Sequence, residues 1–214
     1  MTRLILLRHG DVEGIVPPRF RGRRDLDLSD LGRRQAQAAA QRIAQDSQPA
    51  LIYSSPLRRC LQTAQPLART CRLEVVTHAD LNDLDFGDWE WLTLEEARTR
   101  SPALYERWLN DPHLVRFPGG ESLQDLFART ANLLRVVLER HSGGTAVIVS
   151  HDSVTRALLL QVLGLPPSAY WSVAPDPCSI SEVIYSGLRG TVRRLNETQH
   201  LTATDSPIES PKSS

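Results

Sequence analysis

The fold is decided at the start of the chain, by the stretch Leu4-Ile5-Leu6-Leu7-Arg8-His9-Gly10. Four consecutive apolar residues are typical of a short strand that is buried on both faces. The abrupt change to arginine, histidine and glycine marks the end of this strand, and ligands bind at the carboxyl edge of an open α/β sheet. Gly10 would let the backbone turn sharply there and approach a ligand closely.

The same arrangement returns later in the chain, where Ala146-Val147-Ile148-Val149-Ser150 is followed by His151. Neither segment predicts a site alone, since short motifs recur by chance and a single histidine is more often structural. Parallel strands carry their carboxyl ends to one sheet edge, so we expect His9 and His151 to lie in one site.

The composition is that of one globular domain. The chain has 214 residues, is 41% hydrophobic, and balances 25 Lys and Arg against 25 Asp and Glu, so its net charge argues for neither nucleic-acid nor membrane binding. Three cysteines without paired spacing argue against a disulfide framework or a zinc site and suit a reducing compartment. The first apolar run is too short for a signal peptide and none could span a membrane, which predicts a cytoplasmic protein.

Apolar runs alternate with helical patterns along the rest of the chain. We expect helices over residues 31–44, 55 onward, 122–140 and 154–163. We expect further strands over residues 51–54, 75–77, 180–185 and 191–195. This order predicts a three-layer α/β/α sandwich, with a mainly parallel sheet and helices on both faces. The domain is expected over residues 1–197, and residues 198–214 are predicted to form a disordered tail.

Residues 80–120 differ from this pattern and are predicted to form a lid insertion over the sheet edge. They combine acidic residues with three of the four tryptophans, Trp89, Trp91 and Trp108. Short helices are expected over 94–100 and 102–109. The aromatic side chains fit either a pocket wall or a local core.

Two further segments supply cations. Ser55-Pro56-Leu57-Arg58 predicts a helix with Ser55 at the N-cap and Pro56 at the first helical position, whose N-terminus and Arg58 would attract phosphate. The same segment also fits a surface helix with a solvated arginine. Arg19-Phe20-Arg21-Gly22-Arg23-Arg24 could contact nucleic acid, but acidic residues follow directly, so we expect a loop that lends one or two cations to a nearby anion.

Two histidines and two arginines at one sheet edge fit a phosphate better than a packed core. Cations repel one another unless an anion lies between them, and guanidinium groups match phosphate oxygens. The sequence has no triad serine, P-loop or metal-ligand spacing. We therefore expect a site for a small phosphorylated metabolite, with no metal and no other cofactor.

The motifs resemble those of the histidine phosphatase superfamily, also called phosphoglycerate-mutase-like. The resemblance rests on Leu7-Arg8-His9-Gly10, Ser54-Ser55-Pro56-Leu57-Arg58-Arg59, Phe86-Gly87-Asp88-Trp89-Glu90 and Ser150-His151. It extends over roughly residues 3–195 and includes Phe20-Arg21-Gly22 and Pro118-Gly119-Gly120-Glu121-Ser122. The family fold, an α/β/α sandwich with a lid insertion, agrees with the prediction above.

The resemblance implies that His9 is the nucleophile and forms a phosphohistidine, for which its attacking nitrogen must be unprotonated. It also implies that Arg8, Arg58 and His151 hold the phosphoryl oxygens, and that the substrate-binding residues include Arg21 and Gly22 as well. The general acid of the family is normally a glutamate, and here Asp83 holds that place with a side chain one methylene shorter. Asp85 is the other candidate for the acid, although its spacing fits a structural role better.

Two further departures bear on the site. Trp91 stands where a glycine is frequent and should narrow the pocket mouth. His151 is followed by Asp152 and Ser153 in place of the frequent glycine, and Ser153 is expected to cap the next helix.

Three functions remain. The first is a metal-independent phosphomonoesterase that acts through a phosphohistidine. The second is a phosphoglycerate mutase, which uses the same chemistry but needs paired arginines in the insertion, where only Arg98, Arg100, Arg107 and Arg116 occur, none of them paired. The third is a phospho-ligand-binding protein in which Asp83 marks a decayed acid. The physiological substrate is not identified by the sequence, and a homodimer is left open.

Overall fold

One six-stranded sheet organises the molecule. The computed structural model describes residues 1–13, 17–141, 143–187 and 189–201. The strand order is β3-β2-β4-β1-β5-β6. The strands are β1 (Thr2–Arg8), β2 (Leu51–Ser54), β3 (Val75–Thr77), β4 (Thr145–Ser150), β5 (Ile180–Ser186) and β6 (Arg189–Glu197). The first four strands are parallel, and the last two are antiparallel to their neighbours, which confirms the mainly parallel sheet.

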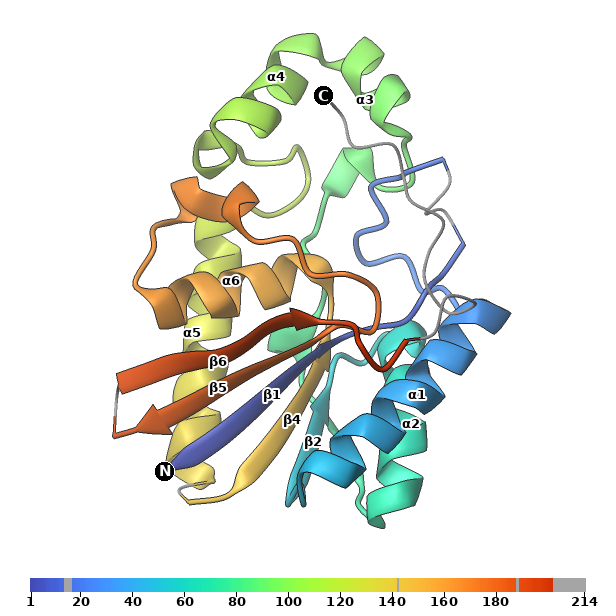
Figure 1. Cartoon of the computed structure of the whole chain (residues 1–214). Helices are drawn as coiled ribbons and strands as arrows, with labels where there is room; N and C mark the ends of the chain where they lie inside the picture. The colour runs from blue at the N-terminus through green and yellow to red at the C-terminus, as the bar shows by residue number, and fades with distance from the viewer. Residues whose placement is uncertain (14–16, 142, 188, 202–214) are drawn as a thin grey trace.

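Helices cover both faces of this sheet, as the sequence predicts (Figure 1). Helices α1 (Asp30–Asp46) and α2 (Arg58–Cys71) lie on one side, and α5 (Leu123–Arg140) and α6 (Asp152–Leu163) lie on the other. Strand β1 feeds both cores, because alternate side chains of a strand point to opposite faces. Ile5 and Leu7 pack in the cluster with α1 and α2, while Leu4 and Leu6 pack in the cluster with α5 and α6.

Serine caps begin two of the four large helices. Ser29 accepts a hydrogen bond from Gly32 N at the start of α1, and Ser122 forms a capping box with Asp125 at the start of α5. The predicted cap at Ser55 is wrong, because α2 begins only at Arg58. The backbone N–H of Ser55 instead donates to Val149 O of strand β4, so this residue still belongs to the sheet edge.

The insertion contains helices α3 (Leu94–Arg100) and α4 (Pro102–Asn110), which match the predicted short helices, and three 3₁₀ turns, η1 (Ala79–Leu81), η2 (Gly87–Trp89) and η3 (Pro112–Leu114). It stands above the sheet in Figure 1. Phe117 lies at the centre of its aromatic side chains. Ring centroids lie 4.9 to 6.5 Å from that of Phe117 for Phe20, Phe86, Trp89 and Trp108. The aromatic residues therefore form a local core of the insertion.

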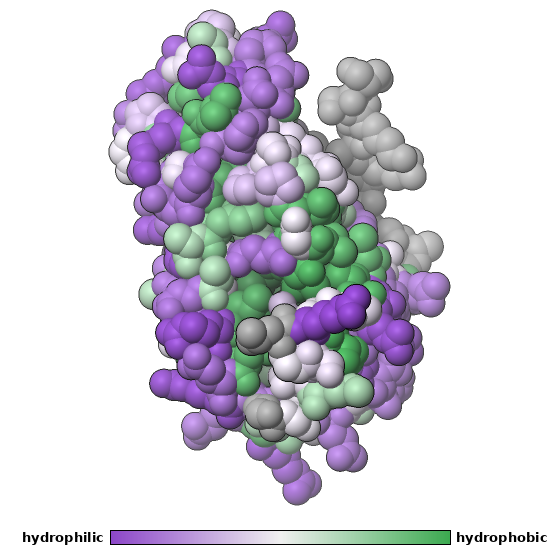
Figure 2. Space-filling view, turned by 90° about the vertical axis from the view of Figure 1, so that its left-hand side faces the viewer, coloured by the Kyte–Doolittle hydropathy of each residue, from purple (hydrophilic) through white to green (hydrophobic). Residues whose placement is uncertain are grey.

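Apolar residues also gather on the outer face near α5 and α6 (Figure 2). A groove of about 570 Å³ there is lined in part by Leu134, Leu138 and Tyr185. Met1 and Thr2 line the same groove, so it lies at the opposite end of β1 from His9. It is therefore separate from the sheet edge at which the histidines emerge.

The end of the chain is described only in part. Residues 198–201 form a turn in which Leu201 N donates to Thr198 O, and Leu201 packs against the α1–α2 cluster. The rest of the predicted tail, residues 202–214, lies outside the described residues. Among the described helices, none combines the length and the apolar character needed to cross a membrane.

Gly10 is needed for the packing between the end of β1 and helix α1. A Cβ atom on Gly10 would lie 2.6 Å from the carbonyl oxygen of Gly32, in the first turn of α1. Such a distance does not occur without movement of the backbone. The close approach predicted for Gly10 is therefore made to a helix of the same chain.

The variant Gly10→Ala should lower the free energy of unfolding by about 1–3 kcal/mol, because the added methyl group overpacks a contact between two backbone segments. Gly144→Ala is the matched control, since its Cβ would meet nothing closer than 4.0 Å. Urea denaturation measures both. Equal effects of the two substitutions would show that close packing is not what requires glycine at position 10.

Candidate active site

The pairing of β1 with β4 brings the two histidines together. Arg8 is paired with Ser150 in the parallel register, so His9 and His151 follow at neighbouring positions. The backbone N–H of His9 donates to Ser150 O at 2.8 Å, and the two imidazole centroids lie 5.3 Å apart in an edge-to-face arrangement. Both side chains are buried. The predicted meeting of the two histidines is confirmed.

His9 has a defined tautomer. Its Nδ1 lies 2.7 Å from the carbonyl oxygen of Gly10, and because a carbonyl can only accept, Nδ1 carries the proton. Nε2 therefore keeps its lone pair. Burial lowers the pKa of His9 well below its usual value, and the positive charge of Arg59 and the neighbouring His151 lower it further. The imidazole is neutral at physiological pH, as a nucleophile requires.

His151 forms hydrogen bonds with Arg59 and Ser55. Its Nδ1 accepts from Arg59 Nε at 3.2 Å, which leaves Nε2 to donate to Ser55 Oγ at 2.8 Å. Burial, followed by Arg59 and Arg129, lowers the pKa of His151 well below its usual value. The serine that was expected to cap α2 thus orients this histidine.

Arg59, and not Arg58, is the arginine of this helix that belongs to the site. The Arg59 side chain is fully buried, and its Nη2 donates to Gly22 O at 2.7 Å and to Asp83 Oδ2 at 3.2 Å. The Arg58 side chain is 52% exposed and forms ion pairs with Asp25 and Asp27 at the surface. The expectation that Arg58 lies in the pocket is contradicted.

Helix geometry explains why the two adjacent arginines differ. Successive residues of an α-helix differ by about 100° in direction, so neighbouring arginines face different surroundings. Polar residues follow Arg58 at helical spacing and mark the solvent face: Gln62, Gln65 and Arg69. Thr63 and Leu67 follow Arg59 on the buried side. This polar stripe is a sequence signal that identifies Arg59.

Asp83 lies in the site, on the loop that follows η1. One carboxylate oxygen, Oδ1, accepts from Leu84 N at 2.9 Å and from Ser153 Oγ, and the other pairs with Arg59. The expectation that Ser153 caps α6 is wrong, because His151 is the N-cap residue and the Ser153 hydroxyl binds Asp83. Asp85 accepts from Gly87 N and pairs with Arg23, so it stabilises a turn.

The other predicted phosphate-binding residues surround the same position. Arg8 Nη1 donates to Pro175 O at 2.5 Å and lies 3.9 Å from Asp152 Oδ1. Burial and the charge of Arg8 lower the pKa of Arg21 to about 10, which leaves its guanidinium charged at neutral pH. Gly22 has a φ of +52°, and its carbonyl accepts from Arg59. Three guanidinium groups and two neutral imidazoles therefore converge.

A cavity of about 230 Å³ adjoins this cluster. Its polar lining comes from Arg19, Arg21, Asp83, Asp152 and Ser153. Its apolar lining comes from Phe20, Phe86, Leu94, Trp108, Tyr170 and Trp171. Small organic ligands bind in concave sites of this kind, with apolar walls and a few polar groups. No set of three His, Cys, Asp or Glu side chains in the described part of the chain is placed to hold a metal ion.

Trp91 does not narrow the cavity, contrary to expectation. It is absent from the described lining, and the guanidinium groups of Arg19 and Arg24 lie over its ring, 5.2 and 4.6 Å from the ring centroid. The carbonyl of Trp91 also accepts from Arg19 Nη1 at 2.7 Å. With φ at +70°, Trp91 occupies a backbone conformation that favours glycine. Its contacts hold Arg19 in the cavity wall.

Known proteins share this arrangement over the length of the domain. A sequence model of the histidine phosphatase superfamily (branch 1) matches residues 4–198. Phosphoserine phosphatase 1 of Hydrogenobacter thermophilus is 37% identical over 94% of this chain and 95% of its own length. Bacillus stearothermophilus YhfR has a TM-score of 0.89 at 27% identity, covering 94% of this chain and 99% of that one.

A third comparison includes a ligand. A mutant phosphoserine phosphatase of Entamoeba histolytica, solved in complex with phosphoserine, has a TM-score of 0.85 at 30% identity and covers 94% of this chain and 100% of its own. The family match extends over nearly the whole chain and agrees with the motifs and with the fold. This protein belongs to the histidine phosphatase superfamily.

Proposed function

We propose that this protein is a metal-independent phosphomonoesterase, which transfers the phosphoryl group of a small phosphorylated metabolite to His9 and then to water. The observation that carries the proposal is the neutral His9, whose Nε2 keeps its lone pair next to the positively charged Arg8, Arg21 and Arg59. The site therefore combines a nucleophile with cations that can stabilise the transition state of phosphoryl transfer.

In the first step, the lone pair of His9 Nε2 attacks the phosphorus atom. The bond between phosphorus and the ester oxygen breaks, and its electron pair stays on the leaving oxygen. Asp83, acting as the general acid, donates a proton to that oxygen, so that the product leaves as a neutral alcohol. A phosphohistidine and an Asp83 carboxylate remain.

In the second step, water attacks the phosphorus atom of the phosphohistidine. The Asp83 carboxylate accepts a proton from this water, the bond between phosphorus and Nε2 breaks, and inorganic phosphate forms. The electron pair of that bond returns to Nε2, which restores the neutral imidazole. Both steps develop negative charge on the phosphoryl oxygens, and the three guanidinium groups stabilise it in the place of a metal ion.

The surroundings of the site favour hydrolysis over a mutase reaction. A mutase must hold its reaction intermediate through a second anionic group, but none of the insertion arginines is among the described cavity-lining residues. Arg98 pairs with Glu95, Arg116 pairs with Asp125, and Arg100 donates to the backbone of Asp88. A binding protein without activity is less well supported, because a nucleophile, an acid and the cations are all present.

The cavity and the relatives support a small phosphorylated acid as substrate. Arg19 and Arg21 offer positive charge to a carboxylate next to the phosphoryl position, and the aromatic walls limit the size of the remainder. Phosphoserine, which gives the Hydrogenobacter phosphatase its name and is bound in the Entamoeba structure, has these properties.

The cysteines Cys60, Cys71 and Cys178 are free thiols, which supports the reducing, cytoplasmic setting expected from the sequence.

Loss of the nucleophile tests the covalent mechanism. His9→Ala should lower kcat by about 10⁴-fold or more, as removal of a catalytic nucleophile does. Brief incubation of the unmodified protein with ³²P-labelled O-phosphoserine should give a labelled protein that is stable in base and labile in acid, also in the presence of EDTA. A His9→Ala protein that retains turnover would end the covalent mechanism.

The two adjacent arginines provide a matched pair. Arg59→Ala should lower kcat/KM for p-nitrophenyl phosphate by about 10²–10³-fold, because a buried cation beside the transition state is lost. Arg58→Ala should change it by less than about threefold, because only exposed ion pairs are lost. Thermal melts of both variants control for folding. A larger loss for Arg58→Ala would reverse the assignment.

The leaving group tests Asp83. A general acid matters when the leaving oxygen is strongly basic and matters little when it is an acidic phenol. Asp83→Asn should therefore lower kcat/KM for O-phosphoserine by about 10²–10⁴-fold and that for p-nitrophenyl phosphate much less. Asp85→Asn is the control and should show no such preference. Equal small effects of Asp83→Asn on both substrates would exclude Asp83 as the acid.

A further inference from the structure

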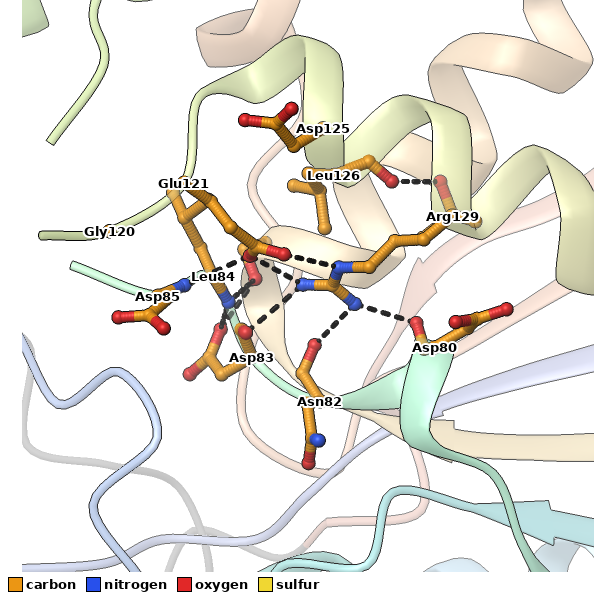
Figure 3. A network of polar contacts seen from close by, with 12 residues as sticks. Asp80, Asn82, Asp83, Leu84, Asp85, Gly120, Glu121, Asp125, Leu126 and Arg129 are labelled. Atoms are coloured by element: carbon orange, nitrogen blue, oxygen red, sulfur yellow. Dashed lines mark hydrogen bonds and ion pairs between the residues drawn. The ribbon is translucent and has the colours of Figure 1, made fainter. Parts of the chain in front are cut away.

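Arg129 on helix α5 uses every donor of its guanidinium group (Figure 3). Nη1 donates to the carbonyl oxygens of Asp80 and Asn82, at 2.6 and 2.7 Å. Nη2 donates to the carbonyl of Asp83 at 3.0 Å and to Glu121 Oε2 at 3.1 Å. Nε donates to Glu121 Oε1 at 3.0 Å. An arginine has five N–H donors, and here all five are bonded.

Three of these bonds fix one short piece of backbone. The carbonyl oxygens of Asp80, Asn82 and Asp83 all turn toward the same guanidinium (Figure 3). This piece carries the Asp83 side chain into the site, on the opposite side from the Arg129 bonds, where it meets Arg59 and Ser153. The Arg129 contacts therefore determine where the Asp83 Cα atom lies, without touching the carboxyl group.

Glu121 extends this support to a second loop of the site. Besides its paired bonds with Arg129, its Oε2 accepts from Asp85 N at 3.1 Å and its Oε1 accepts from Arg23 Nη2 at 3.0 Å. Arg23 directly follows Gly22, whose carbonyl binds Arg59. The Glu121 and Arg129 side chains are only 16% and 13% exposed, so each is a largely buried charge that depends on the other.

We propose that Arg129, paired with Glu121, is a positioning residue for the acid Asp83. This inference rests on the proposed function, in which Asp83 protonates the leaving oxygen. An aspartate side chain has two rotatable bonds and a short reach, so its carboxyl position follows from its backbone position. A displacement of about 1 Å at a reacting group can slow a reaction by about 10²-fold.

Lysine at position 129 separates geometry from charge. Arg129→Lys keeps the positive charge that acts on His151 but cannot reproduce five bonds in a planar fork. It should lower kcat/KM for O-phosphoserine by about 10–100-fold and that for p-nitrophenyl phosphate by less than about threefold. Arg135→Lys is the matched control on the same helix, because Arg135 is an exposed residue paired with Glu139, and it should change neither value.

A double variant shows whether Arg129 acts through Asp83. In the Asp83→Asn background, Arg129→Lys should lower kcat/KM for O-phosphoserine by less than about threefold, because the acid that it positions is already lost. A full further loss in that background, or equal losses for the two substrates in the single variant, would overturn the proposal and leave Arg129 as a stabilising residue only.

Two further measurements complete the test. If the thermal melt shows that Arg129→Lys does not fold, Glu121→Gln replaces it, because glutamine keeps the shape of the glutamate side chain. Glu121→Gln should also lower kcat/KM more for O-phosphoserine than for p-nitrophenyl phosphate. Equal losses for the two substrates would overturn the proposal. The single variant Asp83→Asn tests separately whether Asp83 is the general acid. Without a leaving-group preference in that variant, the acid assignment fails, and the positioning proposal fails with it.

Discussion

The parallel pairing of β1 with β4 is the constraint on which the site depends. Both strands are buried on both faces, so a shift of one residue in their register would turn every side chain toward the opposite cluster, where it would meet neighbours of a different size and shape. The pairing is therefore strongly specified, and it fixes the positions that follow the two strands. The burial of the apolar residues in β1 and β4 therefore brings His9 and His151 together.

The positive charge of Arg59 is buried next to these strands and is stabilised by polar partners. Arg59 has no exposed surface, and it is accommodated by the carbonyls of Gly22 and Arg24, by the imidazole of His151 and by the carboxylate of Asp83. These partners come from loops that are far apart in the sequence. Burial and the same cations lower the pKa of both histidines, so the positive charge that would suit a phosphate also keeps the two imidazoles neutral.

Local patterns were sufficient to predict the sheet, the helices and both histidines, because strand runs and serine caps act over a few residues. They failed at Arg58, where the start of α2 is set by contacts of Ser55 and Asp25 with distant segments. They failed at Trp91 and Ser153 for the same reason. Arg24 on a distant loop lies over the Trp91 ring, and the Asp83 carboxylate binds the Ser153 hydroxyl. The role of Arg129 was not predicted, because the three backbone carbonyls that it binds on the Asp83 loop lie 46 to 49 positions away in the sequence.

The aromatic core of the insertion has a consequence for how this enzyme can evolve. Phe20, Phe86 and Trp108 hold the insertion together, and the same three side chains line the cavity. A mutation that reshapes this wall for a new substrate also weakens the packing of the insertion. Leu94 and Trp171 line the cavity but are 39% and 42% exposed, so they can vary with less loss of stability. Divergence of substrate preference among close descendants of this sequence should therefore begin at the rim, while the inner wall drifts slowly.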